Sequence, residues 1–303
     1  MSLKYWFSSP ENIFVGLSRK GCLKWLDDST YLQMLFKLKT GQRLNLQNPV
    51  TFNEKLQWLK IHNRNPMYTN LVDKYTVRDY VKMKVGESYL IPLIGVYDTY
   101  GDICFEDLPE QFVIKCNHDS GGIYICTDKS KVNHESLSRF FTKKLRCNYF
   151  WPGREWPYLN VARKLVVEKY MVDETHKELR DFKIFCFMGE PRIIQVDYNR
   201  FNGHLRKMYD TKWNCLGFTT KYPTISENEI EKPKNLDEML SVARELSKEC
   251  QPFVRVDLYN TGEHIYFGEM TFFHGGGMER FSDEQWNKKM GSWIDLSCFV
   301  TKE

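Results

Sequence analysis

In the first part of the chain, apolar residues recur at the three- and four-residue spacing of amphipathic helices, whereas many later apolar segments are short runs typical of strands. The sequence Thr51-Phe-Asn-Glu54 has the spacing of a capping box, in which a Thr at the helix start is followed three residues later by a Glu. Gly86 is suited to end a helix, because glycine readily adopts the left-handed backbone found there. Helices are therefore predicted at 28–41, from Thr51 towards Pro66, and at 69–84, 134–146 and 235–250.

Two pairs of apolar runs are separated by short connections that contain glycine, which is the pattern of β-hairpins. The first pair is 181–187 with 192–199, and the second is 253–259 with 264–272. Further strands are predicted at 89–97, 112–116, 123–127, 165–171 and 203–209. The chain is therefore predicted to be α+β, with a helical N-terminal part and a sheet-rich remainder.

The composition narrows the classes of function. Of the 303 residues, 43 are Lys or Arg and 39 are Asp or Glu, so the net charge is +4. This balance argues against a dedicated nucleic-acid-binding protein, but it leaves room for a basic pocket that faces an anion. No apolar run is long enough to span a membrane, and the N-terminus has no secretory pattern. Nine scattered cysteines without a Cys-x-x-Cys pair predict mostly buried free thiols in a reducing cytoplasm.

The second hairpin carries two carboxylates that could hold a metal ion. Alternate residues of a strand share a face, so Asp257 lies with Arg255 and Glu269 lies with Thr271. The two faces coincide if the connecting loop has an odd number of residues, and direct opposition requires a wide loop centred on Glu263. Two opposed carboxylates with a phosphate suit Mg²⁺, and Arg255 would neutralise a developing anion. The alternative is a solvated hairpin with ordinary charges.

The segment 112–122 combines Lys115, in an apolar strand, with Gly121 and Gly122 in the turn that follows. A buried lysine is costly without an anion, and a glycine turn lets backbone N–H groups approach one closely, so this segment could hold phosphate. The alternative is a lysine that extends from an ordinary hairpin into solvent. The sequence contains no P-loop, Rossmann or Gly-x-Ser-x-Gly hydrolase signature.

Three further strands carry polar residues that a nucleotide could use. The strand 165–171 turns polar at its end and could present backbone amides to adenine, although an edge strand entering a loop has the same pattern. Asp181 and Lys183 share one face of their strand, and Arg206 and Lys207 lie on the strand 203–209. These charges could reach a sugar hydroxyl and a terminal phosphate, or they could pair across the sheet.

Two histidines and several aromatic residues allow a functional interpretation. His118 and His274 neighbour glycines and could line a site, but ordinary loop or hydrogen-bonded histidines are the favoured interpretation. Trp151, Trp156 and Tyr158 are candidates for a surface on which a sugar could stack.

Taken in chain order, these pieces resemble the ATP-grasp fold and, more closely, the TupA-like ATP-grasp family of teichuronopeptide biosynthesis. The matching stretches cover roughly residues 50–275 and are 51–60, 73–81, 112–122, 154–158, 181–189, 254–258 and 267–272. The resemblance implies an ATP-grasp fold with a helical extension at 1–71 and an ATP-grasp domain at 72–303. Within that domain, a small lid subdomain would occupy about 100–167 and a larger metal-binding subdomain about 168–303.

The resemblance also implies which residues bind ATP. Lys74 and Lys115 would grip the nucleotide phosphates, and Gly121 and Gly122 would form the flexible loop that closes over them. The hinge that faces adenine would comprise Glu168, Lys169, Tyr170 and Met171. The other nucleotide contacts would be Asp181 on the ribose side, Lys183 and Arg206.

For catalysis, the resemblance implies that Asp257 and Glu269 bind Mg²⁺. Arg255, together with Lys115, would stabilise the transition state through which an acyl phosphate forms. Thr271 stands where the wider superfamily often has an Asn that completes the metal site. This difference puts a second metal ion in doubt.

The implied activity is an ATP-dependent ligation in which a carboxylate becomes an acyl phosphate and an amine then displaces phosphate. The implied partners are a uronic-acid acceptor in a capsular or other cell-surface glycan and an amine donor, either an amino acid or an amino sugar. A glycosyltransferase is the rival enzyme class, but the metal-binding Asp-x-Asp that it would carry is absent from the sequence. A glycan-binding module without catalysis is the third interpretation.

Overall fold

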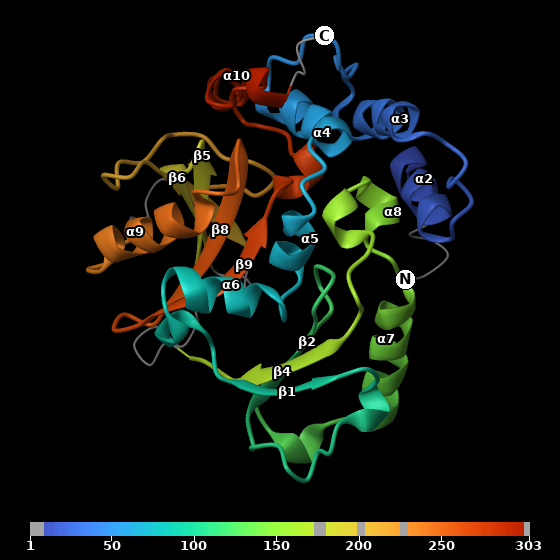
Figure 1. The fold of residues 1–303 in the computed structure, drawn as a ribbon, viewed down its shortest axis with the longest axis vertical. Coiled ribbons are helices and arrows are strands. Elements are labelled where there is room, and N and C mark those ends of the chain that lie inside the picture. The colour runs from blue at the N-terminus through green and yellow to red at the C-terminus, as the bar shows by residue number, and fades with distance from the viewer. Residues whose placement is uncertain (1–8, 173–179, 199–203, 225–229, 300–303) are drawn as a thin grey trace.

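The computed structural model describes residues 9–172, 180–198, 204–224 and 230–299. These residues form two antiparallel sheets with helices around them, which confirms the α+β class (Figure 1). No helix in the described part of the chain is long and apolar enough to cross a membrane.

The nine described strands divide between a small and a large sheet. The small sheet has the order β1-β4-β2-β3, built from β1 (Leu93–Tyr97), β4 (Leu165–Lys169), β2 (Phe112–Cys116) and β3 (Ile123–Cys126). The large sheet has the order β7-β6-β5-β8-β9, built from β7 (Leu205–Tyr209), β6 (Glu190–Tyr198), β5 (Arg180–Phe187), β8 (Phe253–Asn260) and β9 (Ile265–Thr271). All pairs of neighbouring strands are antiparallel.

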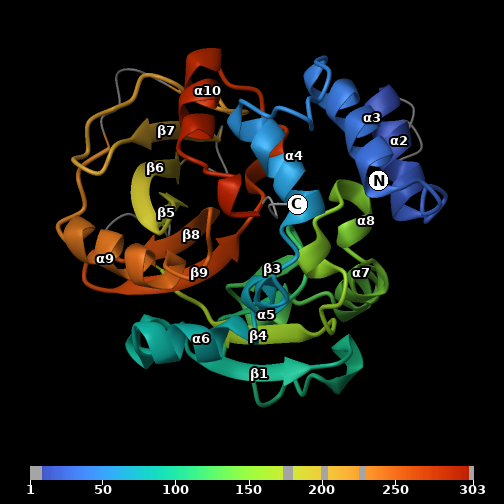
Figure 2. The same cartoon turned by 45° about the horizontal axis from the view of Figure 1, so that its top comes forward.

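Helices cover the sheets and join them. The α-helices are α2 (Pro10–Arg19), α3 (Asp28–Thr40), α4 (Phe52–His62), α5 (Met67–Val72), α6 (Val77–Lys84), α7 (His134–Arg146), α8 (Phe150–Gly153), α9 (Leu236–Ser247) and α10 (Glu284–Ser292). Figures 1 and 2 show α9 against the large sheet, α7 beside the small sheet, and α2 and α3 next to α8. The largest apolar core lies around the large sheet, a second lies between the small sheet and α7, and a third joins α2 to α3.

Local signals placed several elements correctly. The Thr51 hydroxyl accepts from the Glu54 backbone N–H while the Glu54 carboxylate accepts from the Thr51 N–H, so the predicted capping box begins α4. Helix α7 and strand β2 have the predicted bounds. The predicted strand ends at Asn199 and Gly203 lie outside the described residues.

The predicted helix 69–84 is wrong as a single element, because the chain leaves the helix at Asp73. The Asp73 carboxylate accepts from the backbone N–H groups of Tyr75 and Thr76, which offers the backbone an alternative to the helix. Two helices, α5 and α6, result, and the turn between them carries Lys74. The predicted strand 89–97 is also shorter, because Glu87–Tyr89 form a 3-10 turn and the strand begins at Leu93.

The cysteine prediction was partly wrong. The eight cysteines whose side chains are described are all free thiols, as expected. Only four of them are buried, namely Cys116, Cys126, Cys186 and Cys250. The other four are exposed, because apolar sequence neighbours do not guarantee that a side chain points into the core.

Candidate active site

A cavity of about 1150 Å³ brings together most of the residues that the sequence singled out. Its walls are one face of the large sheet, the turn between β2 and β3, and the segments that follow α8 and β9. The predicted site residues that line it are Lys74, Lys115, Gly121, Gly122, Asp181, Lys183, Arg206, Arg255, Asp257 and Glu269. Residues separated by nearly two hundred positions in the chain therefore share one site.

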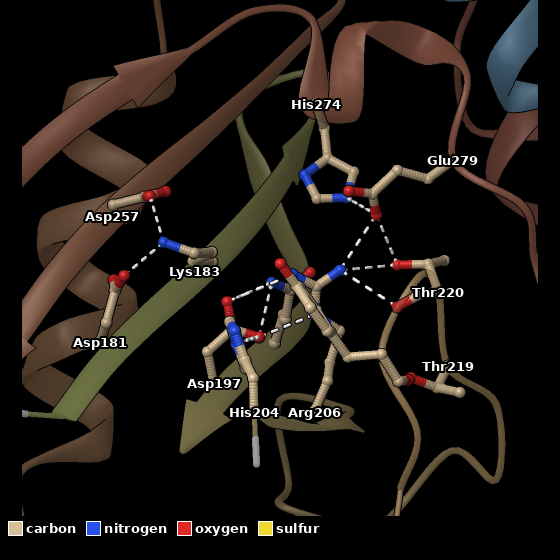
Figure 3. Close-up of polar contacts among 12 residues, drawn as sticks. Asp181, Lys183, Asp197, His204, Arg206, Thr219, Thr220, Asp257, His274 and Glu279 are labelled. Carbon is tan, nitrogen blue, oxygen red and sulfur yellow. Dashed lines mark hydrogen bonds and ion pairs between the residues drawn. The ribbon is translucent and has the colours of Figure 1, made fainter. Parts of the chain in front are cut away.

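The pairing of strands explains why these charges meet. Lys183 on β5 lies opposite Asp257 on β8, and Asp257 lies opposite Glu269 on β9. Lys183 also bridges two carboxylates, because its ammonium group contacts Asp181 and donates to Asp257 over 2.8 Å. Figure 3 shows Lys183 between the two aspartates. In this carboxylate row, Asp257 and Glu269 are neighbours of like charge, and each has a cation beside it, Lys183 for Asp257 and Lys74 for Glu269.

Direct opposition of Asp257 and Glu269 arises differently from the prediction. Asn260 pairs with Ile265, so the loop between them has four residues rather than an odd number. A register shift between Asp257 and Leu258 leaves one extra residue, Gly268, on β9, and this bulge restores the opposition. A Cβ at Gly268 would lie 3.1 Å from the Asp257 carbonyl oxygen, so the bulge favours a residue without a side chain.

Arg255 is the centre of the hydrogen-bond network. Its Nε and Nη2 donate to Asp257 over 2.6 and 2.7 Å, and Nη2 also donates to the Thr271 hydroxyl over 3.1 Å. The fork of two parallel bonds fixes both side chains. Burial acts to lower the pKa of Arg255, but Asp257 and Glu269 outweigh burial and raise it.

Glu269 is held as a carboxylate by two cations. Its oxygens lie 3.3 Å from the Lys74 ammonium group and 3.3 Å from Arg255 Nη2. Burial opposes ionisation, yet Lys74 and Arg255 lower the pKa of Glu269 to about 2. Glu269 therefore stays ionised at neutral pH, as a metal ligand must.

The glycine turn between β2 and β3 is closed by Asp119. Its carboxylate accepts from the Gly122 N–H over 3.1 Å and pairs with Lys144 over 2.8 Å. A Cβ at Gly122 would lie 2.3 Å from the Asp119 carboxylate, so this closure requires glycine. Lys74 donates to the Asp119 carbonyl over 2.9 Å, which ties the turn to the carboxylate row.

Lys115 and the predicted hinge are linked by an ion pair. The Lys115 ammonium group lies 2.5 Å from the Glu168 carboxylate, which Arg78 also contacts over 3.3 Å. The backbone N–H of Lys169 donates to the Pro92 carbonyl. Glu168 to Met171 are not among the residues that line the cavity, so contact with adenine stays a prediction.

Arg206 lines the cavity, but its guanidinium group is already bound. It donates to Asp197 over 2.7 Å and to Glu279 over 3.0 Å, and it also bonds Thr220 (Figure 3). Lys207 is not among the cavity-lining residues. Arg206 thus links β7 to the loop around Thr220 here, and its contact with a phosphate stays a prediction.

Asp181 lies beside Lys183 at the carboxylate row, and its role as a ribose-side acid stays a prediction. The aromatic prediction was partly wrong. Trp156 is 8% exposed and stacks on Tyr68 in the core. Tyr158 does line the cavity, next to Tyr149.

His274 is a hydrogen-bonded loop histidine, in agreement with the favoured interpretation, and one of its partners is the site residue Arg255. Arg255 Nη1 donates to His274 Nδ1 over 2.7 Å, so the ring is neutral and its Nε2–H donates to Glu279 over 3.2 Å. Burial lowers the pKa of His274 to about 4, although Glu279 opposes the shift. No local sequence pattern could have identified Arg255 as a partner of His274, because it lies nineteen positions away on another element.

This histidine predicts a loss of stability in mild acid. The unfolded chain binds a proton at His274 near pH 6.5 and the folded protein only near pH 4. The free energy of unfolding should therefore fall by about 3 kcal/mol as the pH drops through this window. His274→Asn should flatten that dependence in urea unfolding at several pH values, and exposed His264→Asn should not. Equal slopes for the parent and His274→Asn would contradict the assignment.

The donor set of the carboxylate row fits Mg²⁺. Among the described residues, no group of three or more His, Cys, Asp and Glu could hold a metal ion by itself. Two opposed carboxylates are nevertheless enough, because Mg²⁺ commonly takes one or two protein carboxylates and completes its shell with phosphates and water. Asp257 and Glu269 provide those oxygens in the cavity.

Comparisons with known proteins identify the family. No curated protein matches the sequence. Among solved structures, the D-alanine–D-alanine ligase from Bacillus anthracis with ATP is 19% identical, over 67% of this chain and 56% of the ligase, with a TM-score of 0.39. A biotin carboxylase from Campylobacter jejuni is 11% identical, over 83% of this chain and 53% of the carboxylase, with a TM-score of 0.46. The chain spans little more than half the length of these proteins.

The sequence profile of the TupA-like ATP-grasp family matches residues 54–295, which is most of the chain and includes every strand described above. The chain therefore belongs to the TupA-like ATP-grasp family.

Proposed function

We propose that the protein is an ATP-dependent carboxylate–amine ligase that forms an amide through an acyl phosphate. The observation that carries the proposal is the opposed pair Asp257 and Glu269, with Arg255 forked onto Asp257 and Lys74 beside Glu269 in one cavity. Asp257 and Glu269 would hold Mg²⁺, which draws charge from the phosphates of ATP when bound.

The protein's own residues would supply positioning and charge. Lys74, Lys115 and Lys183 would bind phosphate oxygens, and Arg255 would stabilise charge that develops at the carboxylate under attack. The turn at Gly121 and Gly122 would exclude water, which otherwise hydrolyses an acyl phosphate. We also propose a division into a helical extension at 1–71 and an ATP-grasp domain with a small lid. The separate apolar core of the small sheet and α7 supports the lid, whereas α4 and α5 of the extension pack in the core of the large sheet.

The proposed substrates are a uronic-acid carboxylate of a capsular or other cell-surface polysaccharide, or its precursor, and the amine of an amino acid or amino sugar. This choice rests on the family, and the reducing cytoplasm is proposed as the compartment because the described cysteines are free thiols. No role in nucleic-acid binding is proposed.

Nucleotide preference tests the proposal. Mg-ATP at about 100 times its Kd should stabilise the protein by about 2.7 kcal/mol and raise its melting temperature, whereas uridine-diphosphate sugars should not. ATP turnover is then screened with uronic-acid oligosaccharides against amino acids and glucosamine. Stabilisation by a uridine-diphosphate sugar alone would favour the glycosyltransferase. Unchanged Mg-ATP binding by Lys115→Ala and Glu269→Ala would contradict the site.

A further inference from the structure

A buried carboxyl group with no bonded partner lies in the cavity wall. Glu155 is 9% exposed and lines the cavity. Within the described part of the chain, no hydrogen bond or ion pair reaches its carboxyl group, in contrast to Asp257, Glu269 and Asp197. An unpaired buried carboxylate is costly, so it is a strong candidate for binding a cation that enters the cavity.

The chain holds Glu155 between two anchored neighbours. Arg154 before it has a φ of 52°, which is strained for a residue with a side chain. The Arg154 side chain is 1% exposed and donates to the backbone carbonyls of Leu23 and Leu26. Trp156 after it is packed in the core. The anchored side chains of Arg154 and Trp156 therefore fix the backbone at Glu155, whose own side chain lines the cavity.

Lys60 lies behind Glu155 but is not paired with it. Its ammonium group donates to the Gly153 and Gly276 carbonyls, each over 2.8 Å, and to the Gln57 side chain over 3.1 Å. Neutral oxygens thus use all three of its N–H bonds. Burial raises the pKa of Glu155, and Lys60 acts in the opposite direction. The carboxyl group can therefore both bind a cation and accept a proton.

Aromatic rings complete this wall. Tyr149 and Tyr158 line the same cavity as Glu155, and their ring centroids are 4.9 Å apart in an edge-to-face arrangement. An ammonium group is attracted both by a carboxylate and by the faces of aromatic rings. The pairing of one carboxyl group with two tyrosines is therefore chemically matched to an amine in its protonated form.

We propose that Glu155, Tyr149 and Tyr158 form the ammonium subsite for the amine donor, and that Glu155 takes one proton from it. This inference rests on the proposed function. The donor R–NH₃⁺ gives a proton to the Glu155 carboxylate and becomes R–NH₂. The amine then attacks the acyl carbon of the acyl phosphate. A C–N bond forms, the bond between the acyl carbon and the phosphate oxygen breaks, and the departing phosphate carries away the second proton.

Hydroxylamine separates the two half-reactions. It is unprotonated near neutral pH and traps an acyl phosphate as a hydroxamate without needing an ammonium subsite. With ATP and oligogalacturonate or oligoglucuronate, Glu155→Gln should form hydroxamate at the parental rate, while amide formation with amino acids or glucosamine falls about 100-fold. An equal fall in both products, or in neither, would overturn the assignment. Surface Glu135→Gln on α7 is the matched control.

A binding measurement does not depend on ligase activity. Glucosamine and alaninamide should raise the melting temperature of the parent more than their N-acetyl derivatives do, and this difference should vanish in Glu155→Gln. If no uronate yields hydroxamate but the difference persists, the proposed function fails while the subsite stands. If the parent shows no difference between the amines and their N-acetyl derivatives, the subsite is wrong.

Variants at two further positions guard against a merely structural effect. A Cβ at Gly153 would lie 2.9 Å from the Glu155 carboxylate, at the end of a side chain that can move, so Gly153→Ala should displace it and raise the KM for the amine. Tyr158→Phe keeps the ring and should retain amine binding, whereas Tyr158→Leu should lose it. Equal behaviour of Phe and Leu at this position would remove the aromatic part of the proposal.

Discussion

Glu269→Gln is expected to lower ATP turnover about 1000-fold while the protein remains folded. The amide keeps the size of the side chain but cannot carry the negative charge that Lys74 and Arg255 stabilise at a pKa of about 2. The row of opposed residues would retain Asp257 alone as a carboxylate ligand, and Mg²⁺ prefers charged oxygens. Saturation with Mg²⁺ should therefore require a much higher concentration, which a titration of turnover against Mg²⁺ measures.

The folded state should tolerate this change. The Glu269 side chain is about one-third exposed, and Lys74 keeps its bond to the Asp119 carbonyl. The matched control is Glu190→Gln on the same sheet, which removes an exposed carboxylate that pairs with Arg244 over 2.9 Å. The control should retain parental turnover. A parental Mg²⁺ dependence in Glu269→Gln, with a normal melting temperature, would rule out Glu269 as a metal ligand.

The hairpin of β8 and β9 shows how far local sequence patterns reach. Alternation along each strand placed Asp257 and Glu269 on defined faces, and the glycine-containing connection indicated a hairpin. The register, however, depends on the bulge at Gly268, because a four-residue loop alone would have set the two carboxylates apart. A single glycine among apolar residues is too weak a signal to place such a bulge.

Sequence patterns did not identify the residues whose side chains connect distant segments of the chain. Gln57 donates to the carbonyls of Gly276 and Gly277, more than two hundred positions later, and this contact holds the loop that carries His274. Nothing in a local window reveals a partner that far away. Glu155 lay inside the recognised stretch 154–158, but a stretch of sequence does not show which of its side chains face a cavity.

The break at Asp73 shows a signal that was present but outweighed. Helical spacing of apolar residues favoured a continuous helix over 69–84, and Asp is only weakly disfavoured within one. The Asp73 carboxylate instead caps the next turn and also accepts from the side chain of Asn117, which directly follows β2. Tertiary contact thus decides between two local options, and the outcome places Lys74 in the site.

Asn117→Ala is expected to lower the free energy of unfolding by about 4 kcal/mol. The side chain is fully buried. Its amide group donates to Asp73 over 2.9 Å and to the Ala162 carbonyl over 2.8 Å. Its oxygen accepts from the Lys164 backbone N–H over 2.8 Å and from His118 Nδ1 over 3.2 Å. Alanine would remove all four bonds, two of them fully buried, at about 1 kcal/mol for each bond.

The loss of stability should extend to the site. The Lys74 backbone N–H donates to the Asn117 carbonyl, and the Asn117 side chain donates to Asp73 in the turn that carries Lys74. Urea unfolding measures the stability, and the affinity for Mg-ATP should fall as Lys74 loses its fixed position. Exposed Asn45→Ala is the matched control, because its oxygen also accepts from two backbone N–H groups but water can replace it. The control should change stability by less than about 1 kcal/mol. A similarly small change in Asn117→Ala would mean that the junction of β2 with Asp73 does not depend on this side chain.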